Sequence, residues 1–148
     1  MTAGLGTAPT SLAGAVLVCD TAAMVAVPSD PIRVVEQWQA RAWGECDLSA
    51  VDELAADPMV RHGPSGTVRR SHDELKQDLR SYQRALGNPA IEVHERVLDG
   101  DRVWSRVTMR GVSVGTGEPR TVHWLQIHRV DDGRIAELWA LYATDVSW

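Results

Sequence analysis

The chain has 148 residues, of which 44% are hydrophobic and 24% charged, and it carries a net charge of −5. This length suits one domain with one core, and the composition is that of a globular rather than a disordered protein. The acidic balance excludes a general nucleic-acid or anionic-membrane surface, because such partners need concentrated lysine and arginine, and Lys76 is the only lysine.

Residues 1–28 are predicted to be a loosely packed N-terminal extension, and residues 29–148 a single domain. The stretch from Ser11 to Val18 is apolar, but no lysine or arginine precedes it. Asp20 also interrupts it before a membrane-spanning length is reached. We therefore expect a cytoplasmic protein without an export signal or membrane span.

The two cysteines, Cys19 and Cys46, fit neither a metal-binding spacing nor a disulfide framework. In a reducing cytoplasm both are expected to be free thiols.

Helix signals occupy the next part of the chain. Asp30 followed by Pro31 is typical of a helix start, and the apolar spacing predicts a first helix to about Trp43. A short second helix is expected around residues 51–55, and a short strand over residues 59–62.

A third helix is predicted to follow a glycine-rich loop over residues 63–66. Ser71 with Glu74 forms a capping box, and an apolar stripe that includes Leu75, Leu79 and Tyr82 continues to Leu86.

The rest of the sequence alternates with a period of two, which predicts four antiparallel strands joined by hairpins. Their expected ranges are about 91–98, 102–114, 120–130 and 134–145. Helices followed by a run of strands indicate an α+β fold.

The alternation also predicts which side chains share a face. If each hairpin has a three-residue loop, the odd-numbered positions form one face, which is the more apolar and should lie under the helices. Glu95, His123 and Glu137 would then be ionisable groups on the core face, where an unpaired charge is costly. This face, which also carries Met109, is therefore expected to line a pocket.

The even-numbered face carries a wide apolar patch of Trp104, Trp124, Leu138 and Tyr142. Monomers rarely expose such a patch, so we expect a homodimer packed through this face. The alternative is that the N-terminal segment covers it.

Four segments together resemble the SnoaL-like polyketide cyclases of the nuclear transport factor 2-like superfamily. They are Val34–Trp38, Val60–Pro64, Leu98–Val103 and Ile127–Trp139, and the last ends in an acid-x-Trp motif. The resemblance implies a cone-shaped, curved antiparallel sheet wrapping three N-terminal helices around a deep pocket. It also implies a hydrophobic polycyclic or polyketide substrate.

The resemblance implies an intramolecular ring closure by acid/base catalysis, an isomerase-type reaction of antibiotic biosynthesis without metal or cofactor. Glu137 falls at the position of the family's catalytic acid, and His123 at that of an assisting histidine on the preceding strand. Epoxide hydrolysis, epoxide-opening ether closure and a non-catalytic binding or assembly module remain alternatives, because this fold supports many functions.

Six further side chains are expected to contact the substrate: His62, Glu95, Trp38, Tyr82, Trp139 and Met109. The alternative for Trp38 and Tyr82 is an ordinary place in the core. Each of the two candidate catalytic groups also has a structural alternative, which is an arginine ion pair for Glu137 and backbone hydrogen bonding for His123. No metal site is expected, because the spacing of the histidines fits none.

Overall fold

The computed structural model describes residues 30–144. The first helix, α1, spans Pro31–Gln37 and continues as a π-helix, η1, over Trp38–Gly44. Asp30 caps α1 as predicted, since its side chain accepts a hydrogen bond from the amide of Ile32 at 3.0 Å. The sequence therefore placed this helix correctly, although its second half, Trp38–Gly44, is π rather than α.

The other two helices are α2, Ser49–Leu54, and α3, His72–Ala85. The capping box predicted at the start of α3 is present, with Ser71 and Glu74 bonding each other's backbone amides. Leu75 and Leu79 are its buried residues, so the apolar stripe read from the sequence is the face that packs inward.

Within residues 30–144, six strands form one sheet, in the order β2-β1-β6-β5-β4-β3. Their bounds are β1 Ala55–Gly63, β2 Gly66–Arg70, β3 Leu86–Asp99, β4 Arg102–Ser113, β5 Pro119–Asp131 and β6 Arg134–Thr144. The sheet is mixed rather than antiparallel, because β1 runs parallel to β6. Strand β2 was not predicted.

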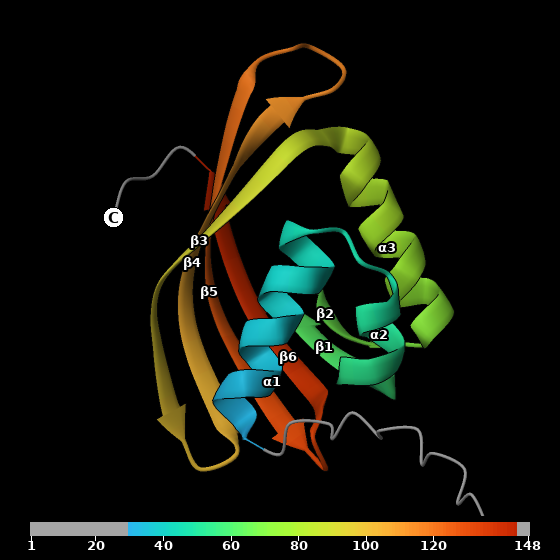
Figure 1. Cartoon of the computed structure of the whole chain (residues 1–148), viewed down its shortest axis with the longest axis vertical. Coiled ribbons are helices and arrows are strands. Elements are labelled where there is room, and N and C mark those ends of the chain that lie inside the picture. The colour runs from blue at the N-terminus through green and yellow to red at the C-terminus, as the bar shows by residue number, and fades with distance from the viewer. Residues whose placement is uncertain (1–29, 145–148) are drawn as a thin grey trace, which may run out of the picture.

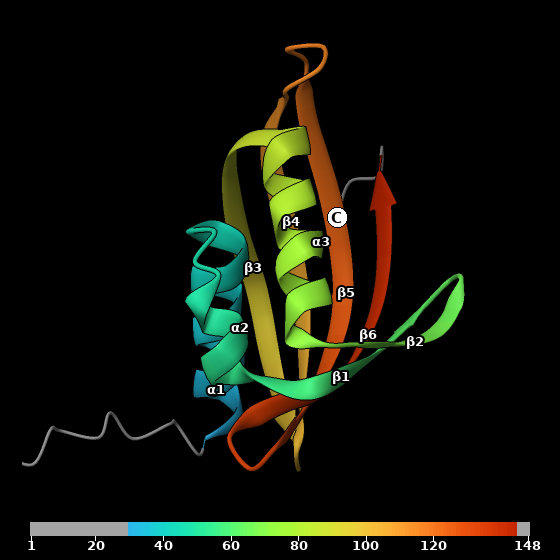
Figure 2. The same cartoon turned by 90° about the vertical axis from the view of Figure 1, so that its right-hand side faces the viewer.

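The long strands curve around the helices, which all lie on one side of the sheet (Figure 1). β1 pairs with the first half of β6, and the hairpin of β1 and β2 extends sideways past that strand (Figure 2). The predicted α+β class and cone-shaped arrangement are thus confirmed.

The predicted faces are correct on β4 and wrong on β5 and most of β6. On β4 the odd-numbered positions, such as Val107 and Met109, are buried beneath the helices. The β4–β5 hairpin pairs odd with even positions, however, with Met109 opposite Val122 and Trp104 opposite Ile127. Directly opposed residues share a face, so β5 and β6 are turned over relative to the expectation.

This reversal changes the direction in which several side chains point. Through the β5–β6 register, His123, Glu137 and Trp139 point away from the helices. Trp124 and Leu138 point toward the helices and are not part of an outer patch. The predicted core-face position of the two catalytic candidates is therefore wrong.

Strand β3 contains a second irregularity. The register shifts between Val93 and Glu95, which is typical of a β-bulge. After the bulge Arg96 points inward and bonds Gln39 at 2.9 Å, while Glu95 points outward to Arg106 at 3.0 Å. The prediction that Glu95 lies on the core face is also wrong.

The core lies between the helices and the sheet. It includes Trp38, with 2% of its surface exposed, and Ile135, which is fully buried. A buried polar connection crosses it, since Gln39 donates to Gln126 and accepts from Arg96. Such satisfied pairs are how a core accommodates polar groups.

The predicted extension, residues 1–28, lies outside the described residues, and so does Cys19. Cys46, in the described part, is a free thiol. Between residues 30 and 144, no helix has the length and apolar character needed to cross a bilayer.

Candidate functional site

A cavity of about 710 Å³ opens between α3, the β1–β2 hairpin and the inner side of β5 and β6. Three aromatic rings form part of its wall. Trp43 meets Tyr82 edge-on at 5.2 Å between ring centroids, and meets Trp124 at 5.6 Å. Flat, rigid surfaces of this kind suit a flat hydrophobic ligand.

The charged groups of this cavity gather where α3 faces β1 and β2. Asp78 accepts a hydrogen bond from Arg61 at 3.0 Å, and Arg70 approaches the same carboxylate oxygen at 3.6 Å. Among the described residues that line the cavity, Asp78 is the one carboxylate. It is therefore the acid/base candidate of this cavity, and the guanidinium of Arg61 fixes its orientation.

Tyr82 supplies the second chemical feature of the cavity. Its hydroxyl is buried and makes no hydrogen bond to any described residue. Burial raises the pKa of Tyr82, so the hydroxyl stays protonated and remains a donor near neutral pH. A buried donor without a partner is costly, and a ligand oxygen would relieve that cost.

β6 presents apolar side chains to the cavity, with Leu138 and Ala140 in the wall. Glu137, the residue before Leu138, lies on the opposite face of the sheet, where it is directly opposite Arg129 on β5. Its Oε2 is 3.1 Å from His62 Nε2, and its Oε1 accepts from Arg129 at 2.8–3.0 Å.

This environment determines the charge of Glu137. The hydrogen bond from His62 and then the guanidinium of Arg129 lower the pKa of its carboxyl group. The arginine ion pair, which is the structural alternative for Glu137, is thus present in the structure.

His62 has defined partners on both ring nitrogens. Nδ1 lies 2.8 Å from Thr67 Oγ1, while Nε2 contacts Glu137. The ring stacks on Trp139 with 4.7 Å between centroids and an 8° tilt. His62 also contributes to the cavity lining beside the Gly63–Gly66 turn.

His123 occupies a separate place. Its Nδ1 is 2.9 Å from Thr108 Oγ1, and His94 contacts the same hydroxyl at 2.7 Å. His123 does not line the cavity. The structure therefore does not bring His123 and Glu137 together.

The other predicted substrate contacts divide into three groups. Tyr82, like His62, lines the cavity. Trp38 and Met109 are buried in the core, with 2% and 1% of their surfaces exposed, and neither lines the cavity. Glu95 and Trp139 belong to a groove on the outer side of the sheet.

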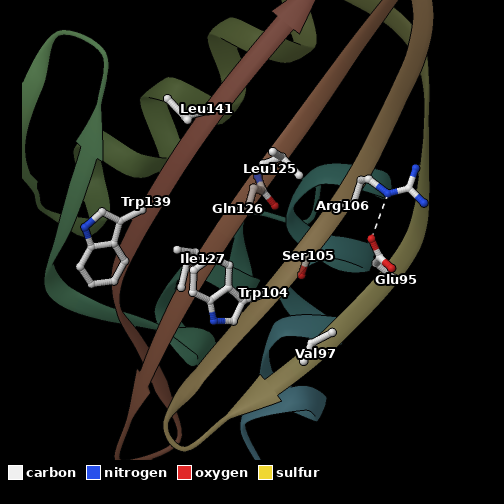
Figure 3. Close-up of a pocket in the computed structure, with 10 residues that line it drawn as sticks. All are labelled: Glu95, Val97, Trp104, Ser105, Arg106, Leu125, Gln126, Ile127, Trp139 and Leu141. Atoms are coloured by element: carbon white, nitrogen blue, oxygen red, sulfur yellow. Dashed lines mark hydrogen bonds and ion pairs between the residues drawn. The ribbon is translucent and has the colours of Figure 1, made fainter. Parts of the chain in front are cut away.

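That outer groove encloses about 310 Å³ (Figure 3). Apolar side chains from four neighbouring strands dominate it, namely Val97, Trp104, Leu125, Ile127, Trp139 and Leu141. Trp104 is 48% exposed and Leu141 63%. The outer face does carry an apolar patch, but the predicted composition is wrong: only Trp104 of the four expected residues lines this groove. Trp124, Leu138 and Tyr142 line the inner cavity instead.

Sequence reasoning missed Trp43, Asp78 and Trp124 as cavity residues. One signal could have identified Asp78, because it precedes Tyr82 by four positions and so lies on the same face of α3. No such signal existed for Trp124, since its direction depends on the β4–β5 register. Within residues 30–144, no three His, Cys, Asp or Glu side chains converge as a metal site would require.

Comparisons with known proteins agree with this arrangement. The curved sheet around helices and a cavity is the nuclear transport factor 2-like or ketosteroid isomerase-like fold, shared with a Catenulispora acidiphila protein of that description. Residues 35–138 match the SnoaL-like domain, so the chain belongs to the SnoaL-like family.

Among solved structures, IdmH from Streptomyces antibioticus, a proposed polyketide cyclase, is 26% identical with a TM-score of 0.67. The match covers 76% of this chain and 91% of IdmH. AclR from Streptomyces galilaeus, a proposed hydroxylase, is 21% identical with a TM-score of 0.68, covering 78% and 79% of the two chains. No curated protein matches the chain.

Proposed function

We propose that this protein is a cofactor-independent cyclase that closes a ring in a polyketide-type small molecule bound in the inner cavity. The observation that carries the proposal is the buried hydroxyl of Tyr82, which lacks a partner in an aromatic-walled cavity. Membership of the SnoaL-like family and the similarity to IdmH support the substrate class.

An intramolecular aldol closure fits the groups of this cavity. Asp78 would remove a proton from the carbon next to a substrate carbonyl, and the enolate would attack a second carbonyl to form the new C–C bond. Asp78 then returns its proton to the resulting alkoxide. The Tyr82 hydroxyl would donate to the oxygen on which charge develops. No atoms are gained or lost, so substrate and product have the same mass.

This assignment differs from the one made on sequence. There, Glu137 is the acid/base and His123 assists; here, neither side chain lines the cavity. Glu137→Gln and His123→Asn are therefore matched controls for Asp78→Asn, since each removes one titratable group at a different place.

The experiment is product analysis by chiral chromatography and mass spectrometry, with aromatic polyketide esters and hydroxy-epoxides as substrates. We expect an isomer of unchanged mass from the wild type, a loss of roughly 100-fold or more in Asp78→Asn, and near-normal turnover in both controls. Loss in Glu137→Gln with normal turnover in Asp78→Asn would restore the sequence-based assignment.

Two other outcomes identify the alternatives. A product heavier by one water indicates epoxide hydrolysis rather than ring closure. Binding measured by quenching of tryptophan fluorescence, without conversion of any bound compound, indicates a non-catalytic binding module and contradicts the cyclase.

We also propose that the protein forms a homodimer through the outer groove. Exposed Trp104, Leu125 and Leu141 lie on one face, and burying them would remove a continuous apolar surface from water. Light scattering at micromolar concentration should show a dimer that Trp104→Arg converts to a monomer. A monomeric wild type contradicts this assembly.

A further inference from the structure

A second hydrogen-bonded group of reactive side chains centres on His62, which lines the cavity, while its partners Thr67 and Glu137 do not. His62 on β1 is directly opposite Thr67 on β2 and Trp139 on β6. Thr67 Oγ1 is 2.8 Å from His62 Nδ1, and Glu137 Oε2 is 3.1 Å from His62 Nε2. A hydroxyl, an imidazole and a carboxylate are thus hydrogen-bonded in series.

The hydrogen bonds define which nitrogen of His62 carries the proton. Arg129 engages Glu137 Oε1, which leaves the ionised Oε2 as an acceptor only. The neutral imidazole therefore places its N–H on Nε2, toward Glu137. Nδ1 is then an unprotonated nitrogen that accepts the hydroxyl proton of Thr67.

The ring of His62 is also held in orientation. It stacks on Trp139 nearly in parallel, and its two hydrogen bonds restrict rotation within the ring plane. A hydroxyl in contact with a base that a third group orients is the general arrangement of an activated nucleophile.

We propose that Thr67 is a nucleophile for acyl transfer, with His62 as its base and Glu137 as the residue that positions His62. Thr67 Oγ attacks the carbonyl carbon of an activated ester while its proton passes to His62 Nδ1. The new C–O bond forms, the bond to the leaving alcohol breaks, and His62 gives the proton to that alcohol. The product is acyl-Thr67.

The acyl donor is a short one, because Thr67 is exposed on the edge strand β2 and does not line the apolar groove. His62 borders the cavity that holds Asp78 and Tyr82, but Thr67 and Glu137 do not line it. Acylation of Thr67 and ring closure in the cavity are therefore followed by separate measurements.

The test uses p-nitrophenyl acetate with the full chain carrying Lys76→Arg, which removes the only lysine amine that could be acetylated. We measure release of p-nitrophenolate, the intact mass and the acetylated peptide. The expected result is a rapid release of one equivalent, with one acetyl group on Thr67.

Four variants in this background sharpen the test. Thr67→Val should abolish the acetylation, and Thr67→Ser should keep it because the hydroxyl remains. Thr121→Val, which removes another exposed hydroxyl on the sheet, should change nothing. His62→Gln should slow acetylation by about 100-fold or more.

Glu137→Gln separates a positioning role from a merely structural one. We expect slower acetylation together with a shifted pH profile, because the amide carries no charge to stabilise the imidazolium that forms when His62 takes the proton. An acetyl group on another residue of the parent chain, or unchanged release in Thr67→Val, overturns the proposal. Peptide mapping of the parent chain identifies the acetylated residue, so it tests the proposal even if a variant fails to fold.

Discussion

Polar side chains on the two sides of the sheet differ in whether they have hydrogen-bonding or ion-pair partners. On the outer face, Glu92, Glu95 and Glu137 each pair with an arginine from a neighbouring strand. On the inner face, the Tyr82 hydroxyl and both ring nitrogens of His128 are buried without a hydrogen bond to any described residue. The outward carboxylates are thus satisfied by ion pairs, while the buried polar groups that lack a partner lie on the side of the cavity.

This difference shows why counting ionisable residues misdirects the search for a site. A carboxylate beside an arginine is stable as it stands, so its presence says little about ligands. A buried donor or acceptor without a partner is costly and is retained only if something else compensates. Tyr82 is therefore a better guide to the cavity than Glu137.

The largest expected contrast is in stability. Trp38→Ala on the inner side should lower the free energy of unfolding by about 3–5 kcal/mol, because a fully packed ring leaves a void. Trp104→Ala on the outer side should lower it far less in the monomer, since half of that ring is already exposed. Urea unfolding below the concentration at which dimers form measures both; equal losses would contradict the contrast.

The next largest effect is the loss of folding stability at acidic pH. Burial lowers the pKa of His128 from 6.5 to about 3, so the unfolded chain binds a proton at this residue well before the folded one does. His128 therefore makes stability fall as the pH decreases from about 6.5 towards 3.

His128→Phe removes that dependence and two unpartnered nitrogens. We expect an unfolding free energy about 1–3 kcal/mol higher near neutral pH and a smaller decrease in acid. Thermal unfolding at several pH values compares the two proteins. Parallel pH curves would show that other groups cause the acid sensitivity.

A smaller, selective effect is expected at Tyr82. Tyr82→Phe deletes a hydroxyl that bonds to no described residue, so stability should change by less than about 1 kcal/mol. Affinity for a carbonyl-bearing cavity ligand should fall by roughly 5–10-fold, the equivalent of one hydrogen bond. Fluorescence titration of the two proteins tests this, and an unchanged affinity removes Tyr82 from the site.

The smallest expected effect is a change in stability caused by a substitution on the outer face. The guanidinium of Arg102 lies 5.6 Å from the ring centroid of Trp139, within the range of a cation–π contact. Arg102→Gln should lower the unfolding free energy by about 0.5–1 kcal/mol. Trp139→Leu should make the same Arg102 change neutral, and a full effect in that background would show that the contact does not contribute.

The sequence by itself determined most of the elements, though not strand β2, and the family. Asp30 with Pro31 and the pair Ser71–Glu74 placed two helix starts, because caps act within a few residues of the backbone they satisfy. The period of two placed the four long strands, and the four matching segments identified the SnoaL-like family.

Only the tertiary structure decided which side of each strand faces the helices. Alternation shows that neighbouring side chains point to opposite faces, but it is symmetric and does not say which face is buried. Which face is buried is set on β5 by the odd-to-even pairing with β4, and on β3 by the bulge at Glu95. Both features depend on long-range packing. The β4–β5 pairing is the reason that Trp124 faces the cavity and Glu137 lies outside it.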